Sequence, residues 1–402
     1  MNSNGVPAKL RIAVVGCGSA GPAAAILLAR QGHEVSLYER APECRPVGAG
    51  FLLQPSGMAV LETLGILDEI IDHGSRVDRL HVLDAGGDDL LDLRYAELGN
   101  NRFGLGLHRP VLLHFLLKAL EKEKVEIMWG HEVTGLERSD SGWRLSFADK
   151  PRATHFDLLI AADGTRSLLR ERLGCRCADK SYPWGAHWFI GSNDGTFPEG
   201  DLHQIVDGTR RLAGFLGTGR NVGCDDKLVS LFWSIRLAED QHIRSRPLGE
   251  WKDEIMRTVP RSEKLLSQIT DWQQILTARY GDIRMKHWHG HDWVLLGDAA
   301  HAMSPQLGQG VNLALADAWF LSYCISRAPL REALHQYSRR RRFALRYYSL
   351  ATRQLTPWFQ SDHEFLTPLR KAFFRTMQHL PPARKFMTAT MAGLIGNPRV
   401  QP

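Results

Sequence analysis

The sequence predicts an α/β protein in which a parallel sheet flanked by helices is interrupted by a β-rich insertion and followed by a helical C-terminal segment. Strand-like and helix-like segments alternate over residues 10–74 and 104–174, the pattern turns β-rich over 182–280, and 329–402 reads as helices separated by prolines. Alternating strands and helices are typical of a parallel sheet. A chain of 402 residues exceeds one ordinary core, so we expect about two domains.

The first element is a buried strand at 12–15 that leads into a glycine-rich turn and a helix at 23–31. The turn has the pattern GxGxxG and consists of Gly16, Cys17, Gly18, Ser19, Ala20 and Gly21. Gly16 permits the tight turn, Gly18 lets the backbone approach a pyrophosphate, and Gly21 lets the helix pack on the strand. Free N–H groups at the start of the helix favour a bound phosphate. This arrangement indicates a Rossmann-type dinucleotide site.

The second strand, 35–38, ends at Glu39. A carboxylate about 20 residues beyond the glycines accepts hydrogen bonds from a ribose hydroxyl pair and repels a 2′-phosphate. The pattern therefore fits the adenosine half of FAD or of NAD, and this motif alone does not distinguish them.

Two later segments distinguish them. The strand at 157–162 breaks at Asp163-Gly164 into a helix rich in Arg and Leu. The strand at 293–296 ends in Gly297-Asp298, where an aspartate can hydrogen-bond a polyol chain, and glycine-rich residues up to Asn312 then open another helix.

With these motifs, residues 10–326 resemble the class A, single-component FAD-dependent aromatic monooxygenases, the family of para-hydroxybenzoate and salicylate hydroxylases and of ubiquinone-biosynthesis hydroxylases. The matching stretches are GCGSAG with Glu39, PVGAGFLLQPSG, LHRPVLLHFL, AADGTRS and GDAAHAMSPQLGQGVNLALADA. The resemblance implies a Rossmann-type FAD-binding domain with an inserted β-sheet substrate domain. The expected ranges are 1–80, 99–180 and 285–326 for FAD, 81–98 and 181–284 for substrate, and 327–402 for the helical segment.

The resemblance also implies the residues that bind FAD. Arg109 matches the arginine near the ribityl chain and diphosphate, Asp298 matches the acid on the ribityl chain, and Asp163 with Gly164 matches the motif tied to FAD and NAD(P)H. The cofactor-binding candidates are Gly16, Gly18, Ser19, Ala20, Gly21, Glu39, Arg40, Arg109, Val133, Asp163, Gly164, Asp298, Pro305, Gly308, Gly310, Val311 and Asn312. His301 follows the same strand, and we give it no catalytic role because a turn histidine is as often structural.

The chemistry expected from this family is hydroxylation of an aromatic or conjugated small molecule with O₂, through a flavin hydroperoxide. FAD is expected to bind without a covalent bond and NAD(P)H to bind transiently, because a single dinucleotide motif occurs in the sequence. The sequence contains no grouping of His, Cys, Asp or Glu with metal-ligand spacing, so no metal is predicted.

The β-rich part supplies aromatic side chains for the substrate site, although most of them are expected to be ordinary core. These are Tyr182, Trp184, His187, Trp188, Phe189, Phe215, Phe232 and Trp233. If a phenol must be ionised, His187 and Arg211 are the polar groups to test first as catalytic residues.

Three alternative functions stay open at this point. A flavin-dependent halogenase would carry a WxWxIP stretch, and the nearest match, Phe232 to Arg236, fails it. A reductase or dehydrogenase on the same scaffold is compatible with the FAD motifs. A non-catalytic flavin-binding protein is compatible with them as well.

Composition and charge indicate which kinds of partner, such as nucleic acid or a membrane, the protein is expected to bind. The formal charge of +6 comes largely from the C-terminal quarter, including Arg339 to Arg342, which favours a solvated helix face over nucleic-acid binding. The N-terminus lacks a signal-peptide pattern and no run is long and apolar enough to span a bilayer, so we expect a cytoplasmic protein, monomer or homodimer. The tail 365–396 is amphipathic, which favours packing or dimerisation over peripheral membrane contact.

Overall fold

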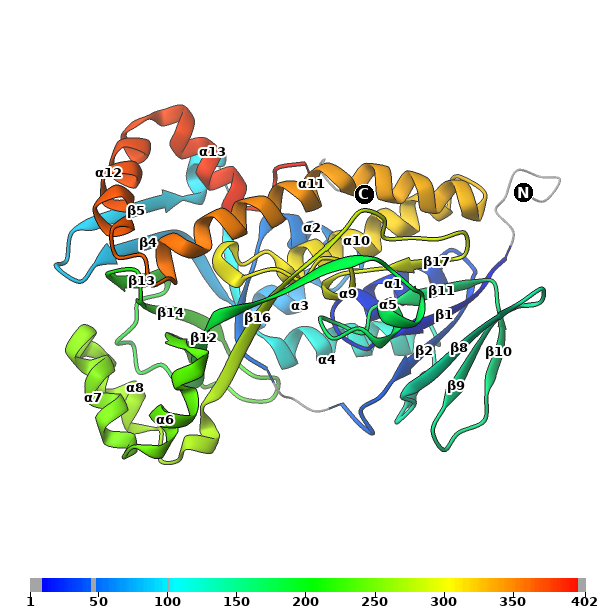
Figure 1. Ribbon diagram of the computed structural model, residues 1–402, viewed down its shortest axis with the longest axis horizontal. Coiled ribbons are helices and arrows are strands. Elements are labelled where there is room, and N and C mark those ends of the chain that lie inside the picture. Colours follow the sequence, from blue (N-terminus) through cyan, green and yellow to red (C-terminus); the bar gives the residue numbers. More distant parts are fainter. Residues whose placement is uncertain (1–8, 45–47, 100, 397–402) are drawn as a thin grey trace.

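The computed structural model describes residues 9–44, 48–99 and 101–396 (Figure 1). Within these residues, five parallel strands form one sheet in the order β17-β11-β1-β2-β7. Their bounds are β1 Arg11–Val15, β2 Glu34–Glu39, β7 Ile127–Trp129, β11 Leu158–Ala161 and β17 Trp293–Leu295. The predicted return of the chain near residue 293 to the first sheet is confirmed, because β17 pairs with β11.

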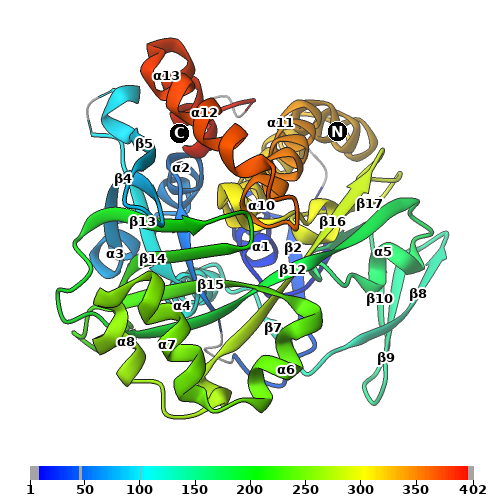
Figure 2. The same ribbon diagram turned by 60° about the vertical axis from the view of Figure 1, so that its left-hand side comes forward.

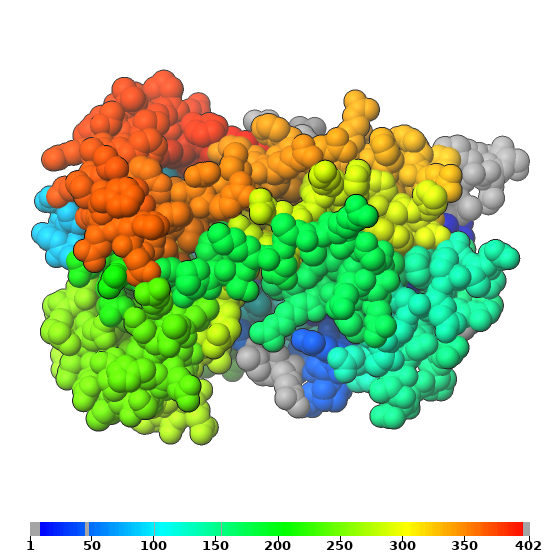
Figure 3. All heavy atoms as spheres, in the orientation of Figure 1, coloured from blue at the N-terminus to red at the C-terminus, as the bar shows by residue number. Residues whose placement is uncertain are grey.

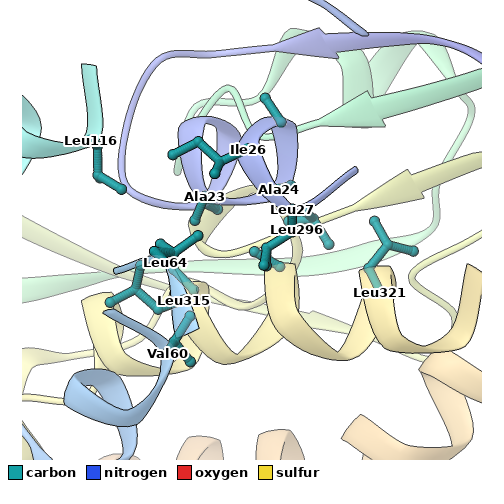
Figure 4. Close-up of a cluster of buried hydrophobic side chains, with 14 of the residues drawn as sticks. Ala23, Ala24, Ile26, Leu27, Val60, Leu64, Leu116, Leu296, Leu315 and Leu321 are labelled. Atoms are coloured by element: carbon teal, nitrogen blue, oxygen red, sulfur yellow. The ribbon is translucent and has the colours of Figure 1, made fainter. Parts of the chain in front are cut away.

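Helices cover this sheet and share its core. They are α1 Ala20–Arg30, α2 Pro55–Thr63, α3 Leu67–His73, α4 Arg109–Lys122 and α10 Gly310–Ile325. In Figure 4, Ala23 and Ile26 of α1, Val60 of α2 and Leu315 of α10 meet in one cluster of buried side chains. The small alanines of α1 let it pack closely on α10 and on the sheet, which holds the glycine-rich turn rigidly.

A larger sheet forms the second layer. Among the described residues it has nine strands, in the order β16-β12-β15-β14-β13-β4-β6-β3, with β5 paired to β4. The bounds are β3 Gly50–Leu53, β4 Ser75–Asp84, β5 Asp89–Arg94, β6 Gly104–His108, β12 Cys177–Ser192, β13 Gly200–Asp207, β14 Arg211–Gly219, β15 Leu228–Arg236 and β16 Leu276–Met285.

The hairpin expected at 81–98 is present as β4 and β5, and it joins the β-rich insertion because β4 pairs with β13. The hairpin starts earlier than expected, at Ser75. Strands β3 and β6 also pair into this sheet, although their residues lie in the ranges expected for the FAD-binding domain. The division of the chain into domains at the stated residues stays a prediction.

One face of the large sheet is covered by short helices, α6 Asp240–Ser245, α7 Leu248–Thr258 and α8 Glu263–Ser267 (Figure 2). Trp251 and Ile255 of α7 pack there on Phe215 and Trp233 of the strands. The aromatic side chains on this face are therefore core, and the opposite face of the strands is left for a cavity.

A third sheet was missed by the sequence analysis. It is antiparallel, in the order β10-β9-β8, with bounds β8 Val133–Ser139, β9 Gly142–Phe147 and β10 Ala153–Phe156. Its apolar side packs on Tyr38 of β2 and on Leu159 of β11. The two short helices α5 Leu168–Arg172 and α9 Asp298–His301 follow strands β11 and β17.

The C-terminal segment is helical, as predicted, with α11 Leu330–Phe359, α12 Leu366–His379 and α13 Pro381–Met391. The expectation that prolines separate these helices is wrong at Pro357, because this proline lies inside α11, which ends two residues later, at Phe359. Pro357 has no N–H to donate to the Arg353 carbonyl, and the helix ends within one turn after it. Pro368 lies in the first turn of α12, where proline is tolerated. None of the helices described is long and apolar enough to cross a membrane.

Candidate active site

Three neighbouring hollows in the described part of the chain form a continuous path between the sheets. The first, of about 230 Å³, lies at the ends of β1 and β2, the second, of about 290 Å³, lies at the start of α1, and the third, of about 590 Å³, lies against the large sheet. Gly18 and Gly164 line both the first and the second. Arg109, Asp298 and Val311 line both the second and the third. The shared residues make the hollows contiguous.

The glycines of the first turn have distinct roles. A Cβ on Gly16 would collide with the Ala162 carbonyl oxygen, and one on Gly21 would collide with the Gly16 carbonyl oxygen. Gly16 also has a φ of 108°, which side chains rarely adopt. No atom lies within 4 Å of a Cβ built on Gly18, so the space above it is open. Gly16 and Gly21 thus allow the turn to form, and Gly18 leaves room for a diphosphate.

Glu39 holds the same turn from the end of β2. Its Oε2 accepts a hydrogen bond from the Cys17 N–H at 2.7 Å, and its Oε1 accepts one from the Ala41 N–H at 2.9 Å. Both Glu39 and Arg40 line the first hollow, together with Val133 of the third sheet. The carboxylate is therefore held in place at the wall of the first hollow.

The middle of the path lies between Arg109, which begins α4, and Asp298, which begins α9. The side chain of Arg109 packs over Gly48, where a Cβ would be 2.8 Å from the Arg109 Cδ. Thr165 Oγ1 donates to Asp298 Oδ2 at 3.4 Å. A cation and an anion thus lie at the junction of the second and third hollows, which suits a chain that carries phosphates at one end and hydroxyls at the other.

The turn that carries Asp298 is held by a buried ionic cluster. Asp317 of α10 accepts hydrogen bonds from the Gly297 N–H at 2.9 Å, from His301 Nε2 at 2.5 Å and from Arg341 Nε at 2.7 Å. Burial opposes the charge of Asp317, yet His301 and Arg341 hold its pKa below the usual range. His301 therefore has a structural partner, which agrees with giving it no catalytic role.

The largest hollow has one wall from the large sheet and one from the loop after α9. Side chains alternate along a strand, so Leu212, Gly214 and Leu216 of β14 line this cavity, while Ala213 and Phe215 belong to the core under α7. On the neighbouring strands, Phe232 and Trp188 line it too, with ring centroids 5.4 Å apart and planes at 84°. The opposite wall contains Pro305, Gly308 and Val311.

Apart from Gly21 and Asn312, every predicted cofactor residue lines one of the three hollows. Gly21 lies under the turn. Asn312 is fully buried, where its Oδ1 accepts from the Gln54 N–H and its Nδ2 donates to the Leu52 and Gly308 carbonyls. Asp163 lines the first hollow, but its carboxylate also accepts from Ser167 Oγ and the Leu169 N–H, and burial raises its pKa.

The two catalytic candidates lie away from the cavity. His187 points to the helix-covered face, where it is 1% exposed and hydrogen-bonds Asp240 through Nε2 at 2.9 Å. Burial lowers its pKa. Arg211 forms an ion pair with Glu254 and lies over the Trp233 ring. Successive side chains of a strand point to opposite faces, and the cavity residues Trp188 and Leu212 directly follow His187 and Arg211. The sequence prediction was therefore one residue away from the cavity on each strand.

Other residues of the cavity were missed. Gln204 of β13 and Arg279 and Tyr280 of β16 line it, as does Gln306. Gln204 lies two residues from the cavity residue Leu202 on β13 and so shares its face of the strand, but the sequence analysis assigned no strand to these residues. Arg279 and Tyr280 carry no motif, and their strand was not identified as part of the site. The polar groups are few among apolar walls, which is typical of a pocket for a small organic ligand.

The fold and these hollows are typical of α/β proteins that bind a dinucleotide next to an apolar cavity. Comparison with known proteins identifies its family. Residues 9–347 match the family model described as FAD binding domain. The chain is 31% identical to 3-amino-4-hydroxybenzoate 2-monooxygenase of Streptomyces cremeus, with 83% of each covered, and 28% identical to 6-hydroxynicotinate 3-monooxygenase of Bordetella bronchiseptica, with 81% of this chain and 85% of the relative covered.

A solved structure of Klebsiella pneumoniae HpxO with FAD and uric acid matches with a TM-score of 0.82, at 22% identity, over 97% of each chain. The chain thus belongs to the class A FAD-dependent aromatic monooxygenases. It is an oxidoreductase that uses FAD, NAD(P)H and O₂ to hydroxylate an aromatic compound. FAD supplies the acceptance of hydride and the activation of oxygen, and the protein binds, orients and shields the reactants.

Proposed function

We propose that FAD lies extended along the three hollows. Its adenosine end lies at Glu39, its diphosphate above Gly18, its ribityl chain between Arg109 and Asp298, and its ring system in the third hollow beside Val311. The continuity of the hollows is the observation that carries this proposal, because residues at each junction line both neighbours. The N-terminus of α10, at Gly310, adds backbone N–H groups to the ring end.

The substrate ring, in this proposal, occupies the rest of the third hollow, against Phe232 and Trp188. Leu212 and Leu216 give that side of the cavity an apolar surface that keeps water from the reacting carbon. Exclusion of water favours oxygen transfer to the ring over release of hydrogen peroxide. We expect NAD(P)H oxidation to be slow until a substrate fills the cavity.

Mass spectrometry under ¹⁸O₂ tests the reaction. Purified protein is screened by O₂ uptake with aromatic acids and NADH or NADPH, and the product is expected to carry one labelled oxygen. Label from ¹⁸O-water, or a product altered by two hydrogens alone, would exclude monooxygenation of that compound. Omitting and adding chloride or bromide separates halogenation. We also propose that the protein is a monomer or homodimer, which sedimentation of the purified chain tests, and that it is cytoplasmic, which cell fractionation tests.

A further inference from the structure

The C-terminal helices expose an unusual share of the apolar surface. Of the ten large apolar side chains that are strongly exposed among the described residues, seven lie between Phe343 and Phe386. Five of these form what we call the apolar ridge, on α12, its C-terminal end and α13: Phe365, Leu369, Phe373, Leu380 and Phe386. Their exposed fractions run from 45% at Phe373 to 66% at Phe365. Such clustering marks an interaction surface, whereas single exposed apolar residues do not.

Helical spacing places the ridge on the outer side of α12. Phe365, Leu369 and Phe373 are four residues apart, so they lie above one another on one side of the helix. Phe374 and Arg370, on the other side, are buried against the rest of the protein. Figures 1 and 2 show α12 and α13 at an outer corner of the molecule, and Figure 3 shows this orange and red corner protruding at the upper left. The buried side of α12 forms the packing that the sequence predicts for residues 365–396, and the apolar ridge on its other side is exposed.

The charge of this segment is strongly positive. Residues 333–402 contain 12 of the chain's 50 Lys and Arg and only two of its 44 Asp and Glu, which are Asp362 and Glu364. From Phe365 onward the sequence has no acidic residue. Arg375 and Lys385 are exposed on α12 and α13, beside the ridge. Lys371 pairs with Asp84 and Asp88, and Arg384 pairs with Glu97, whereas Arg375 and Lys385 form no ion pair among the described residues.

The exposed apolar side chains together with the positive charge distinguish between two binding partners for the ridge, a second copy of this chain and a lipid membrane. A second copy docked ridge to ridge would bring Arg375 and Lys385 of each chain toward those of the other. The acids that contact these helices, Asp84, Asp88 and Glu97, are already paired with Lys371 and Arg384. A membrane with anionic headgroups provides the opposite charge at the surface and a hydrocarbon layer beneath it. Helices with an apolar face flanked by Arg and Lys bind in this way, lying in the plane of the interface.

We propose that α12 and α13 bind an anionic lipid membrane, with the apolar ridge inserted and Arg375 and Lys385 at the headgroups. The inner side of these helices covers one end of the large sheet, where Phe374 and Met391 pack in a cluster with Leu52, Leu212 and Leu216. Those three leucines also line the third hollow. Membrane binding thus places the layer behind the substrate cavity next to the bilayer.

Vesicle flotation of the full-length, FAD-loaded protein tests the proposal. The probes are vesicles of phosphatidylcholine alone and of phosphatidylcholine with an equal part of phosphatidylglycerol. We expect binding to the anionic vesicles to exceed binding to the neutral ones by about tenfold or more, since each Lys or Arg near an anionic surface strengthens binding by about fivefold. Raising the salt from about 0.1 M to about 1 M shortens the screening length from about 10 Å to about 3 Å and should release the protein.

Two variants separate the contributions. Leu369→Gln with Phe373→Gln should lower binding to anionic vesicles by about tenfold or more. Arg375→Gln with Lys385→Gln should lower it by a similar factor and leave the weak binding to neutral vesicles unchanged. The matched control, Ile71→Gln with Val222→Gln, alters exposed apolar residues elsewhere and should bind as the parent protein does. FAD content and near-UV circular dichroism confirm that each variant is folded.

The alternative occupant has its own signature. Analytical ultracentrifugation of the parent protein and of the ridge variant, without lipid, detects a dimer held by the ridge. A dimer that the ridge variant dissociates, in a protein that ignores both kinds of vesicle, would overturn the membrane proposal in favour of a second copy. Equal binding of the parent, ridge and control proteins to anionic vesicles would overturn it as well.

Discussion

The buried ionic cluster around Asp317 gives a prediction that links stability to cofactor binding. Asp317 and Arg341 are both 0% exposed, and Arg341 joins the C-terminal helix α11 to α10 through this contact and through the Leu313 carbonyl. Replacing Arg341 with Met removes the cation and leaves a buried carboxylate. Breaking a buried ion pair from one side costs about 3–5 kcal/mol. Because His301 still contacts Asp317, we expect the lower end, about 3 kcal/mol.

The effect should reach the FAD site. Asp317 also accepts from the Gly297 N–H, directly before Asp298, so a disturbed Asp317 moves the turn that carries Asp298. Urea unfolding gives the free energy of unfolding, and fluorescence titration of the apoprotein gives the FAD affinity. The exposed neighbour Arg342 supplies the control, since Arg342→Met should change the free energy of unfolding by less than about 0.5 kcal/mol.

A double variant isolates the charge. Asp317→Asn keeps an oxygen acceptor for Gly297 and removes the carboxylate charge, so combining it with Arg341→Met should restore part of the lost stability. If Arg341→Met lowers the free energy of unfolding no more than Arg342→Met does, the Arg341–Asp317 ion pair does not stabilise the protein as described. The same conclusion follows if the double variant is less stable than Arg341→Met by the full additive amount.

Three further predictions follow from single residues. Gly18→Val should abolish FAD binding in a folded protein, since the valine side chain would fill the open space that we assign to the diphosphate. Glu39→Ala should lose only about 1.5–3 kcal/mol of FAD binding energy, and equal losses in the two variants would contradict this assignment. Phe232→Ala should enlarge the cavity and raise the uncoupled release of hydrogen peroxide, measured by a peroxidase assay. Burial, with nearby Arg261, lowers the pKa of His203 to about 4 in the folded protein. As the pH falls from 6.5 to 4, the unfolded state therefore binds a proton on this histidine before the folded state does, and the free energy of unfolding should decrease by up to about 3 kcal/mol. His203→Gln should flatten that limb of the acid unfolding curve.

The sequence predicts residues that line the first and second hollows because the constraints on them are local. Gly16 needs a backbone angle that side chains avoid, and Glu39 must lie at the end of a strand that finishes beside the glycine turn. Such requirements leave a fixed spacing in the chain. The return of the strand before Asp298 to the same sheet is predictable for the same reason, since the motif comprises a strand, a turn and a helix together.

The substrate end depends on contacts that no local pattern contains. The choice between His187 and Trp188 depends on which face of β12 carries the short helices α6 to α8, and only the packed structure decides it. Likewise, Arg341 was interpreted from composition as part of a solvated basic face, yet it is fully buried. Its partner Asp317 lies on another helix, so the periodicity of neither segment identifies the pair.

The C-terminal helices also explain why the cavity loop has its shape. Ser304 Oγ and Thr356 Oγ1 are 2.7 Å apart, Gln306 Nε2 donates to Gln360 Oε1 at 2.7 Å, and Gln309 Nε2 donates to the Met391 carbonyl at 2.6 Å. The three partners lie beyond residue 347, where the family match ends. The loop that faces the flavin ring in our proposal is therefore fixed by a segment outside the matched region. Of the three partners, Thr356 and Gln360 lie in α11 and at its end, and Met391 lies in α13, so the long helix α11 contributes most of the contacts that fix this loop.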